Sequence, residues 1–264
     1  LGQPVTFTYK YQDPENKTYT TKYENYSYDY GTVINPTGTS SSSPYEMLGE
    51  SAFNNTEGST TSLENVLFLN NSVNGTLEST TSAYKYAMIG GGAVYNAGEL
   101  TKVTADFVGN SVEGKGIWTS GYSSVLSNGG AIYNAGTIGD ITGDFIGNYA
   151  QGSSSASGGA IYNVTGTIGD ITGDFIGNYV VSNGSNGEIR GGAIYNNSTI
   201  ANITGDFISN YVQASSDVNG GAIYNEKGVL GEITGDFIGN YVETNGYNKE
   251  IRGGAIYNTG SINN

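Results

Sequence analysis

The chain contains no cysteine and no histidine in its 264 residues. Without cysteine it has no disulfide framework and no thiolate metal site, and without histidine it has no imidazole ligand or imidazole general base. Acidic residues outnumber basic ones by 24 to 10, the net charge is −14, and arginine occurs only as Arg190 and Arg252. We therefore expect no nucleic-acid partner, because no basic cluster is present to neutralise phosphates.

Proline and long apolar runs are also scarce. There are four prolines, and no apolar stretch approaches the ~18 residues of a transmembrane helix. We therefore expect no membrane insertion by this segment. The sequence begins at Leu1 without a signal-peptide h-region, so we expect a chain processed or excised from a longer protein.

Glycine is abundant, with 42 residues, but it follows no three-residue period, which excludes a collagen triple helix. Charged residues make up only 13% of the chain. Asparagine, serine, threonine and tyrosine are frequent, and this composition is typical of strands and turns with little helix. The composition predicts an all-β protein.

Two short motifs repeat along the chain in strict alternation. The hexapeptide G-G-A-[IV]-Y-N begins at Gly91, Gly129, Gly158, Gly191, Gly220 and Gly253, and D-F-x-x-N carries Phe107, Phe145, Phe175, Phe207 and Phe237. The step from the first glycine to the phenylalanine is always 16 or 17 residues, whereas the step from the phenylalanine to the next Gly-Gly varies from 13 to 22. The variable part is therefore predicted to be a loop.

The constant part of each repeat contains three short segments rich in β-formers, exemplified by A-I-Y-N, T-I-G-D-I-T and D-F-I-G-N-Y-V. This pattern predicts a right-handed parallel β-helix, a solenoid with three short strands per coil. We expect a tyrosine-rich N-terminal cap and linker in residues 1–49 and the β-helix in residues 50–264. Its first coil, 50–90, is degenerate, and regular coils span 91–264. Because the chain stops inside a sixth motif, we expect the natural protein to continue.

Two of the variable segments resemble one another closely. They are V-S-N-G-S-N-G-E-I-R at Val181 to Arg190 and E-T-N-G-Y-N-K-E-I-R at Glu243 to Arg252. Duplication of a two-coil unit accounts for them. Stacked on one side of the solenoid they would form a shared surface, and its candidate interaction residues are Glu188, Arg190, Glu250, Arg252 and Tyr247.

Residues at equivalent positions of a β-helix form columns along its axis. We expect the asparagines of both motifs to lie in turns, with their amides bonded to the backbone and to one another. The phenylalanine and isoleucine columns are expected inside. Strict alternation places Phe145 and Asn148 on opposite faces unless Gly147 kinks the chain, and both arrangements remain open at this stage. Tyrosine columns follow both motifs, as half-exposed structural pairs or as a flat surface for sugar rings.

An acidic column stacks like charges at Asp106, Asp144, Asp174, Asp206 and Asp236. In one interpretation each solvated carboxylate accepts backbone N–H bonds at a turn. In the other, calcium lies between neighbouring carboxylates, with Asp144, Asp174, Asp206 and Asp236 as ligands. No catalytic or cofactor-binding residue is predicted, because the acids belong to repeated columns or irregular loops. A threonine column, Thr104 to Thr234, leaves a third possibility, an ordered hydroxyl surface that binds ice or another lattice.

The G-G-A-[IV] and F-x-x-N tetrapeptides resemble the repeats of chlamydial polymorphic membrane proteins and of related autotransporter passengers. The similarity covers about Gly91 to Asn258, with a faint extension to Glu50. It implies a β-helical passenger exported through a C-terminal outer-membrane barrel, with adhesion associated with the two tetrapeptides. This chain departs from that family in lacking the barrel and in lacking cysteine.

From these features we expect a non-enzymatic bacterial cell-surface adhesin or stalk, secreted and attached to the outer membrane through another region, with a role in cell adhesion and virulence. Its expected partner is a host protein or glycan receptor, or another copy of itself. The alternatives are a carbohydrate-binding or carbohydrate-active β-helix, which predicts a groove with acids and aromatics off the repeat, and a self-assembling surface filament. No cofactor is expected apart from possible calcium.

Overall fold

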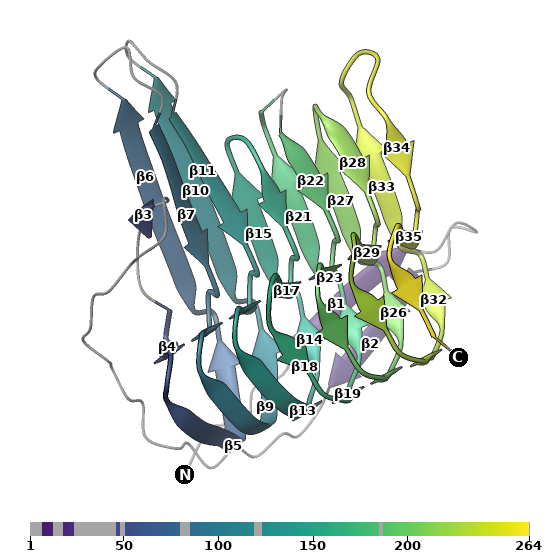
Figure 1. Ribbon diagram of the computed structural model, residues 1–264. Coiled ribbons are helices and arrows are strands. Elements are labelled where there is room, and N and C mark those ends of the chain that lie inside the picture. Colours follow the sequence, from purple (N-terminus) through teal and green to yellow (C-terminus); the bar gives the residue numbers. More distant parts are fainter. Residues whose placement is uncertain are drawn as a thin grey trace.

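The computed structural model describes residues 7–12, 18–23, 46–47, 51–79, 85–118, 123–184 and 187–263. In these ranges every regular element is a β-strand (Figure 1). None of them contains a helix that could span a membrane. Strands of successive coils pair in parallel, which confirms the all-β parallel β-helix predicted from the repeats.

In each coil, the strand after Gly-Gly belongs to sheet 1, and the next strands along the chain belong to sheet 2. Sheet 1 contains β4 (Phe53–Asn55), β8 (Val94–Asn96), β12 (Ile132–Asn134), β17 (Ile161–Asn163), β23 (Ile194–Asn196), β29 (Ile223–Asn225) and β35 (Ile256–Asn258). Sheet 2 contains β5 (Thr60–Leu69), β9 (Glu99–Val108), β13 (Thr137–Thr142), β14 (Phe145–Ile146), β18 (Thr167–Ile168), β19 (Ile171–Thr172), β20 (Phe175–Ile176), β24 (Thr199–Ile200), β25 (Ile203–Thr204), β26 (Phe207–Ile208), β30 (Val229–Leu230), β31 (Ile233–Thr234), β32 (Phe237–Ile238) and β36 (Ser261–Ile262).

Two further sheets complete each coil. Sheet 3 contains β6 (Ser72–Ser79), β10 (Ser111–Trp118), β15 (Tyr149–Gly152), β21 (Tyr179–Ser182), β27 (Tyr211–Ala214) and β33 (Tyr241–Thr244). Sheet 4 contains β3 (Glu46–Met47), β7 (Lys85–Gly90), β11 (Ser123–Asn128), β16 (Ala156–Ser157), β22 (Glu188–Arg190), β28 (Asp217–Asn219) and β34 (Ile251–Arg252). The variable segments thus contain strands of sheets 3 and 4. The sequence predicted them as loops, and only their turns are loops.

The buried side chains form one large core and two smaller clusters. The large core lies between sheets 1 and 2 and contains the stacked phenylalanines, the isoleucines of G-G-A-I-Y-N and those of the T-I-G-D-I-T segments. Smaller clusters, such as Val180 and Val212 with Ile189 and Val218, lie between sheets 3 and 4. Sheets 3 and 4 therefore form a two-layered arm beside a rounded body (Figure 1). The arm stays in register because short apolar residues alternate with polar ones along its strands.

A backbone kink places both the phenylalanine and the asparagine of F-x-x-N inside the molecule. Phe145 and Asn148 are both 0% exposed, so both point inward. Gly147 between them has φ of 61°, in the left-handed region, which is open to glycine at little cost. The kink ends the sheet 2 strand and redirects the chain into sheet 3.

Both asparagine columns form hydrogen-bonded ladders, as predicted. Along sheet 1 each Nδ2 donates to the Oδ1 of the next coil, for example from Asn134 to Asn163 at 2.9 Å and from Asn163 to Asn196 at 2.8 Å. In the F-x-x-N column the Oδ1 of Asn178 accepts from both the backbone N–H and the Nδ2 of Asn148. The amides thus satisfy buried polar groups at the two corners of the body.

The predicted N-terminal cap lies mostly outside the described residues. Within it, β1 (Phe7–Gln12) and β2 (Thr18–Tyr23) pair as an antiparallel hairpin. Strand β3 pairs in parallel with β7. Residues 46–47 therefore belong to sheet 4 of the β-helix, four residues before the start predicted at residue 50.

Candidate interaction surface

The Glu-Ile-Arg segments lie in sheet 4. In β22 the side chain of Ile189 is 0% exposed and its Cα pairs with that of Val218 in the next coil. Glu188 and Arg190 flank it on the outer face, as strand alternation requires. A strand of the intervening coil, β28, lies between β22 and β34. The two predicted interaction segments are therefore separated by a coil and do not stack directly on each other.

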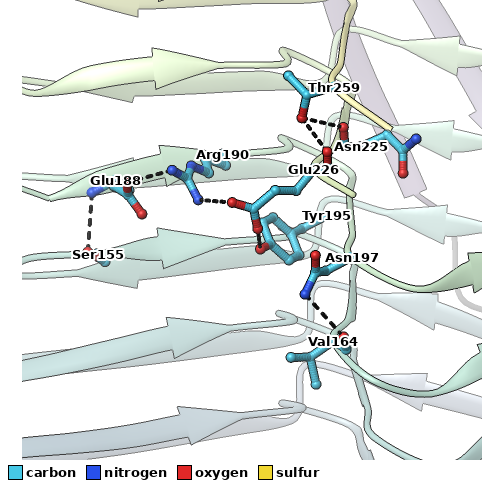
Figure 2. Close-up of polar contacts among 9 residues, drawn as sticks. All are labelled: Ser155, Val164, Glu188, Arg190, Tyr195, Asn197, Asn225, Glu226 and Thr259. Atoms are coloured by element: carbon cyan, nitrogen blue, oxygen red, sulfur yellow. Dashed lines mark hydrogen bonds and ion pairs between the residues drawn. The ribbon is translucent and has the colours of Figure 1, made fainter. Parts of the chain in front are cut away.

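Arg190 is the centre of a polar cluster on this outer face (Figure 2). Its guanidinium is 2.6 Å from the Glu188 carboxylate and 3.4 Å from that of Glu226, and it lies 4.9 Å from the centroid of the Tyr224 ring. The Tyr195 hydroxyl donates a hydrogen bond to Glu226. Because the Arg190 side chain is only 16% exposed, the arginine chiefly ties adjacent coils together.

Arg252 occupies the equivalent position in a more exposed setting. It forms an ion pair with Glu250 and lies 5.8 Å from the centroid of Tyr257. Its side chain is 43% exposed, and Thr259, which follows the next G-G-A-I-Y-N motif, is equivalent to Asn197 of the first copy. Tyr247, at the tip of the same arm, is 89% exposed. Of the five predicted interaction residues, Arg190 is the one that the fold largely covers.

Glu226 was not singled out from the sequence. It follows the asparagine of G-G-A-I-Y-N, where the other coils have Ala97, Ala135, Val164, Asn197 and Thr259. A carboxylate in a column of small or neutral residues is a break in the repeat, and that break was the available signal. Only the structure shows that Arg190, from another column, lies opposite it.

The tyrosines beside this cluster are neutral hydrogen-bond donors. Burial raises the pKa of Tyr162 to about 12, with a smaller contribution from the Glu226 charge. Burial is also the largest cause that raises the pKa of Tyr195, followed by its interactions with Tyr162 and Glu226. These hydroxyls therefore keep their protons at physiological pH and are poorly suited to act as bases.

The tyrosines of sheet 3 stack on one another. Consecutive rings from Tyr149 to Tyr241 have centroids 4.8–5.0 Å apart and planes within 3–5° of parallel. Each ring therefore covers the face of its neighbour, and the column presents edges and hydroxyls to the outside. This stacking argues against a flat platform of ring faces for sugars, which the sequence had left possible.

The acidic column follows the first of its two sequence interpretations. The Oδ1 of Asp106 accepts the backbone N–H of Asp144, and the same contact links Asp144 to Asp174, Asp174 to Asp206 and Asp206 to Asp236, all at 2.8–3.0 Å. Burial raises the pKa of Asp144, and the neighbouring charges of Asp106 and Asp174 add to the effect. No group of three or more acidic side chains placed to hold a metal occurs in the described part of the chain. Calcium between these carboxylates stays a prediction.

The threonine column lies on the outer face of sheet 2, where Thr142, Thr172, Thr204 and Thr234 are exposed. A column of partly charged side chains, Asp140, Asp170, Asn202 and Glu232, runs beside it and repeats the same Oδ1-to-backbone scheme. A second exposed row, Thr137, Thr167 and Thr199, lies five residues earlier in the same sheet, so the two rows are not adjacent as they are in T-x-T repeats.

These features define the chain as a parallel β-helix repeat protein with side-chain ladders at its corners and a projecting two-layered arm. No family model, curated protein sequence or solved structure matches the chain.

Proposed function

We propose that this chain is a bacterial surface adhesin or stalk, the passenger segment of an autotransporter-type secreted protein. The observation that carries the proposal is the location of the length variation. In coils 3 to 6, which begin at Gly129, Gly158, Gly191 and Gly220, the residues between the sheet 3 and sheet 4 strands are 153–155, 183–187, 215–216 and 245–250. Those that the structure describes lie at the tip of the arm, while the ladders of the body keep their register.

A constant framework with variable turns along one edge is the arrangement used by many recognition proteins. Here many equivalent contacts fix the framework, because each coil repeats the same buried phenylalanine and asparagine contacts. Turns are free to change in length on such a support without loss of the core. The resemblance of the G-G-A-[IV] and F-x-x-N motifs to adhesive autotransporter passengers supports the same function.

The test replaces only the two longest of these four turns. Residues 183–187 and 245–250 are each exchanged for the Ser-Ser turn of residues 215–216, so that Ile189 and Arg190 keep their places in β22. Purified wild-type protein and this tip variant are applied to arrays of host matrix proteins and to host cells, with and without calcium. We expect binding by the wild type and its loss in the tip variant.

A matched control carries Thr172→Ala and Thr204→Ala on the outer face of sheet 2, away from the tips. It should bind as the wild type does. If the wild-type protein binds nothing under either condition, the chain is a spacer or self-assembling stalk and the adhesin proposal is wrong. If the tip variant binds normally, the adhesive surface lies elsewhere on the chain.

A further inference from the structure

A cleft of about 490 Å³ lies on sheet 3, where β6, β10 and β15 run side by side. Its walls include Asn74, Thr76, Glu113, Lys115, Gln151 and Asn183. It lies where the eight-residue strands β6 and β10 meet the four-residue strand β15, so it occurs once and outside the exact repeat. Its volume falls within the ~300–1,000 Å³ typical of small-ligand sites.

Strand alternation places the polar side chains of this cleft on the outer face. Val73, Val112 and Ala150 are buried between the sheets, and the residues that follow them, Asn74, Glu113 and Gln151, share one register column. The floor beneath is held rigidly. A Cβ on Gly114 would lie 2.5 Å from the Ser127 hydroxyl and 2.6 Å from a Val125 methyl group, so sheets 3 and 4 are in close contact there.

The cleft exists because the arms differ in length. Strands β6 and β10 each have 8 residues, whereas β15 has 4, and the long arms project beyond the short one (Figure 1). The turn of the short arm is fastened to β10, since the Ser153 N–H donates to the Gly114 carbonyl at 3.1 Å and the Gly116 N–H donates to the Ser153 hydroxyl at 2.8 Å. The step between the arms is thus a fixed feature of the surface.

The chemistry of the walls selects the class of ligand. The lining residues present amides, hydroxyls, one carboxylate and one ammonium group, together with glycine backbone, and none of them is an apolar side chain. Such walls do not suit a lipid chain or an apolar peptide, and a single lysine two residues from a single glutamate on β10 does not select a polyanion. Glu113 is also oriented, because its carboxylate accepts a hydrogen bond from the Tyr149 hydroxyl.

We propose that this cleft binds a saccharide, whose hydroxyls pair with the amides of Asn74 and Gln151 and with the charged groups of Glu113 and Lys115. The proposal rests on the proposed function, in that it treats the chain as a binding module, and it adds a ligand class and a site on sheet 3 that includes Asn183 from the turn of coil 4 and no residue from the turn of coil 6. The cleft presents hydrogen-bond donors and acceptors at regular spacing on a rigid sheet. A saccharide matches them because each of its hydroxyls can both donate and accept a hydrogen bond.

The test uses a glycan array of neutral, N-acetylated and acidic oligosaccharides, followed by calorimetric titration of the strongest hit. The variants are Gln151→Ala and Lys115→Ala. The matched control is Gln213→Ala, which removes an exposed glutamine from the same column two coils further on, outside the cleft. We expect at least tenfold weaker binding in both cleft variants and unchanged binding in the control, with the same thermal unfolding midpoint in all proteins.

Equal affinity in the cleft variants and the control, or no saccharide bound by the wild type, would overturn the assignment of the cleft. A tip variant exchanged only at residues 245–250, which leaves Asn183 in the cleft wall, separates this result from the adhesin proposal. It should retain the saccharide even where it loses attachment to matrix or cells. If the protein attaches to matrix or cells but binds no saccharide, the saccharide proposal is wrong and the adhesin proposal stands. If it binds a saccharide but does not attach, the adhesin proposal is wrong and the saccharide proposal stands.

Discussion

The interior asparagine ladder and the exterior aspartate ladder use the same contact in opposite surroundings. Inside, the Oδ1 of Asn178 accepts the backbone N–H of Asn148 at 3.0 Å. Outside, the Oδ1 of Asp144 accepts the backbone N–H of Asp174 at 2.9 Å. Asn178 is 0% exposed, whereas Asp144 is partly open to solvent. The comparison teaches that a carboxylate is tolerated where water reaches it and where the ladder needs an acceptor alone.

The second exterior column provides an internal control for this argument. There the acids Asp140 and Asp170 are followed by Asn202 and Glu232. The Oδ1 of Asn202 still accepts the next backbone N–H, from Glu232, at 3.0 Å, and its Nδ2 donates to Asp170 at 3.0 Å. An exterior position therefore accepts either side chain, and we expect the interior positions to accept only the amide.

The largest effect is expected from Asn178→Asp. The Nδ2 of Asn178 donates to the Phe145 carbonyl at 2.8 Å and to the Oδ1 of Asn210 at 3.0 Å. In the aspartate these two contacts become repulsive oxygen pairs around a buried charge. We expect a loss of about 3–5 kcal/mol in the free energy of unfolding, measured by guanidinium denaturation at pH 7.

The pH dependence of this variant has a defined sign. Burial raises the pKa of the new carboxyl in the folded state above its unfolded value, so the folded state binds the proton more tightly. The loss of stability should shrink as the pH falls toward the unfolded value of ~3.9 and grow as the pH rises above it. A loss that is small or independent of pH would show that the interior is wetter than the packing indicates.

A smaller effect of opposite sign is expected from the reciprocal change, Asp144→Asn. The amide keeps an Oδ1 for the Asp174 N–H and removes a charge that lies between Asp106 and Asp174, as Asn202 does in its own column. We expect unchanged or higher stability at pH 7, by less than ~1 kcal/mol. Thermal unfolding of the two proteins side by side measures the difference.

The direction in which the stability difference between wild type and Asp144→Asn changes with pH follows from the raised pKa of Asp144. A carboxyl whose folded pKa exceeds its unfolded value contributes more stability once protonated, so the wild type gains stability from this group as the pH falls through that window. The advantage of Asp144→Asn should therefore disappear in acid. An advantage that persists below the unfolded pKa would mean that packing, and not charge, causes it.

The repeat made the fold predictable because every column of the β-helix pairs a residue with its own equivalent. Ile132 pairs with Ile161 and Phe145 with Phe175, so one alignment of the motifs already gives the register. Sheet 4 was missed because from β16 onward its strands are two or three residues long, as in Ala156–Ser157, and follow turns of changing length. No local pattern marks so short a strand as distinct from a loop.

The surface was less predictable, because it depends on contacts between columns that sequence alignment keeps apart. Arg190 was predicted to be an interaction residue, yet it is covered through Glu226 and Tyr224, which belong to another sheet. The cleft likewise depends on the different lengths of β10 and β15. Alignment of the repeats shows what the coils share, whereas these features come from what they do not share.

The smallest predicted change in stability concerns the backbone kink of F-x-x-N, which turns the asparagine side chains inward. Coil 5 has Ser209 where the neighbouring coils have Gly177 and Gly239, and its φ of 53° lies in the left-handed region. A Cβ added at the equivalent Gly147 meets no atom within 4 Å, so the cost of serine is backbone strain and not crowding. Ser209→Gly should therefore raise the thermal unfolding midpoint, with a gain of about 0.5–1 kcal/mol that is partly offset by the greater freedom of glycine in the unfolded chain. Gly177→Ser, the reverse change one coil earlier, should lower stability by a similar amount, and unchanged midpoints in both variants would show that the ladder does not depend on relief of strain at this kink.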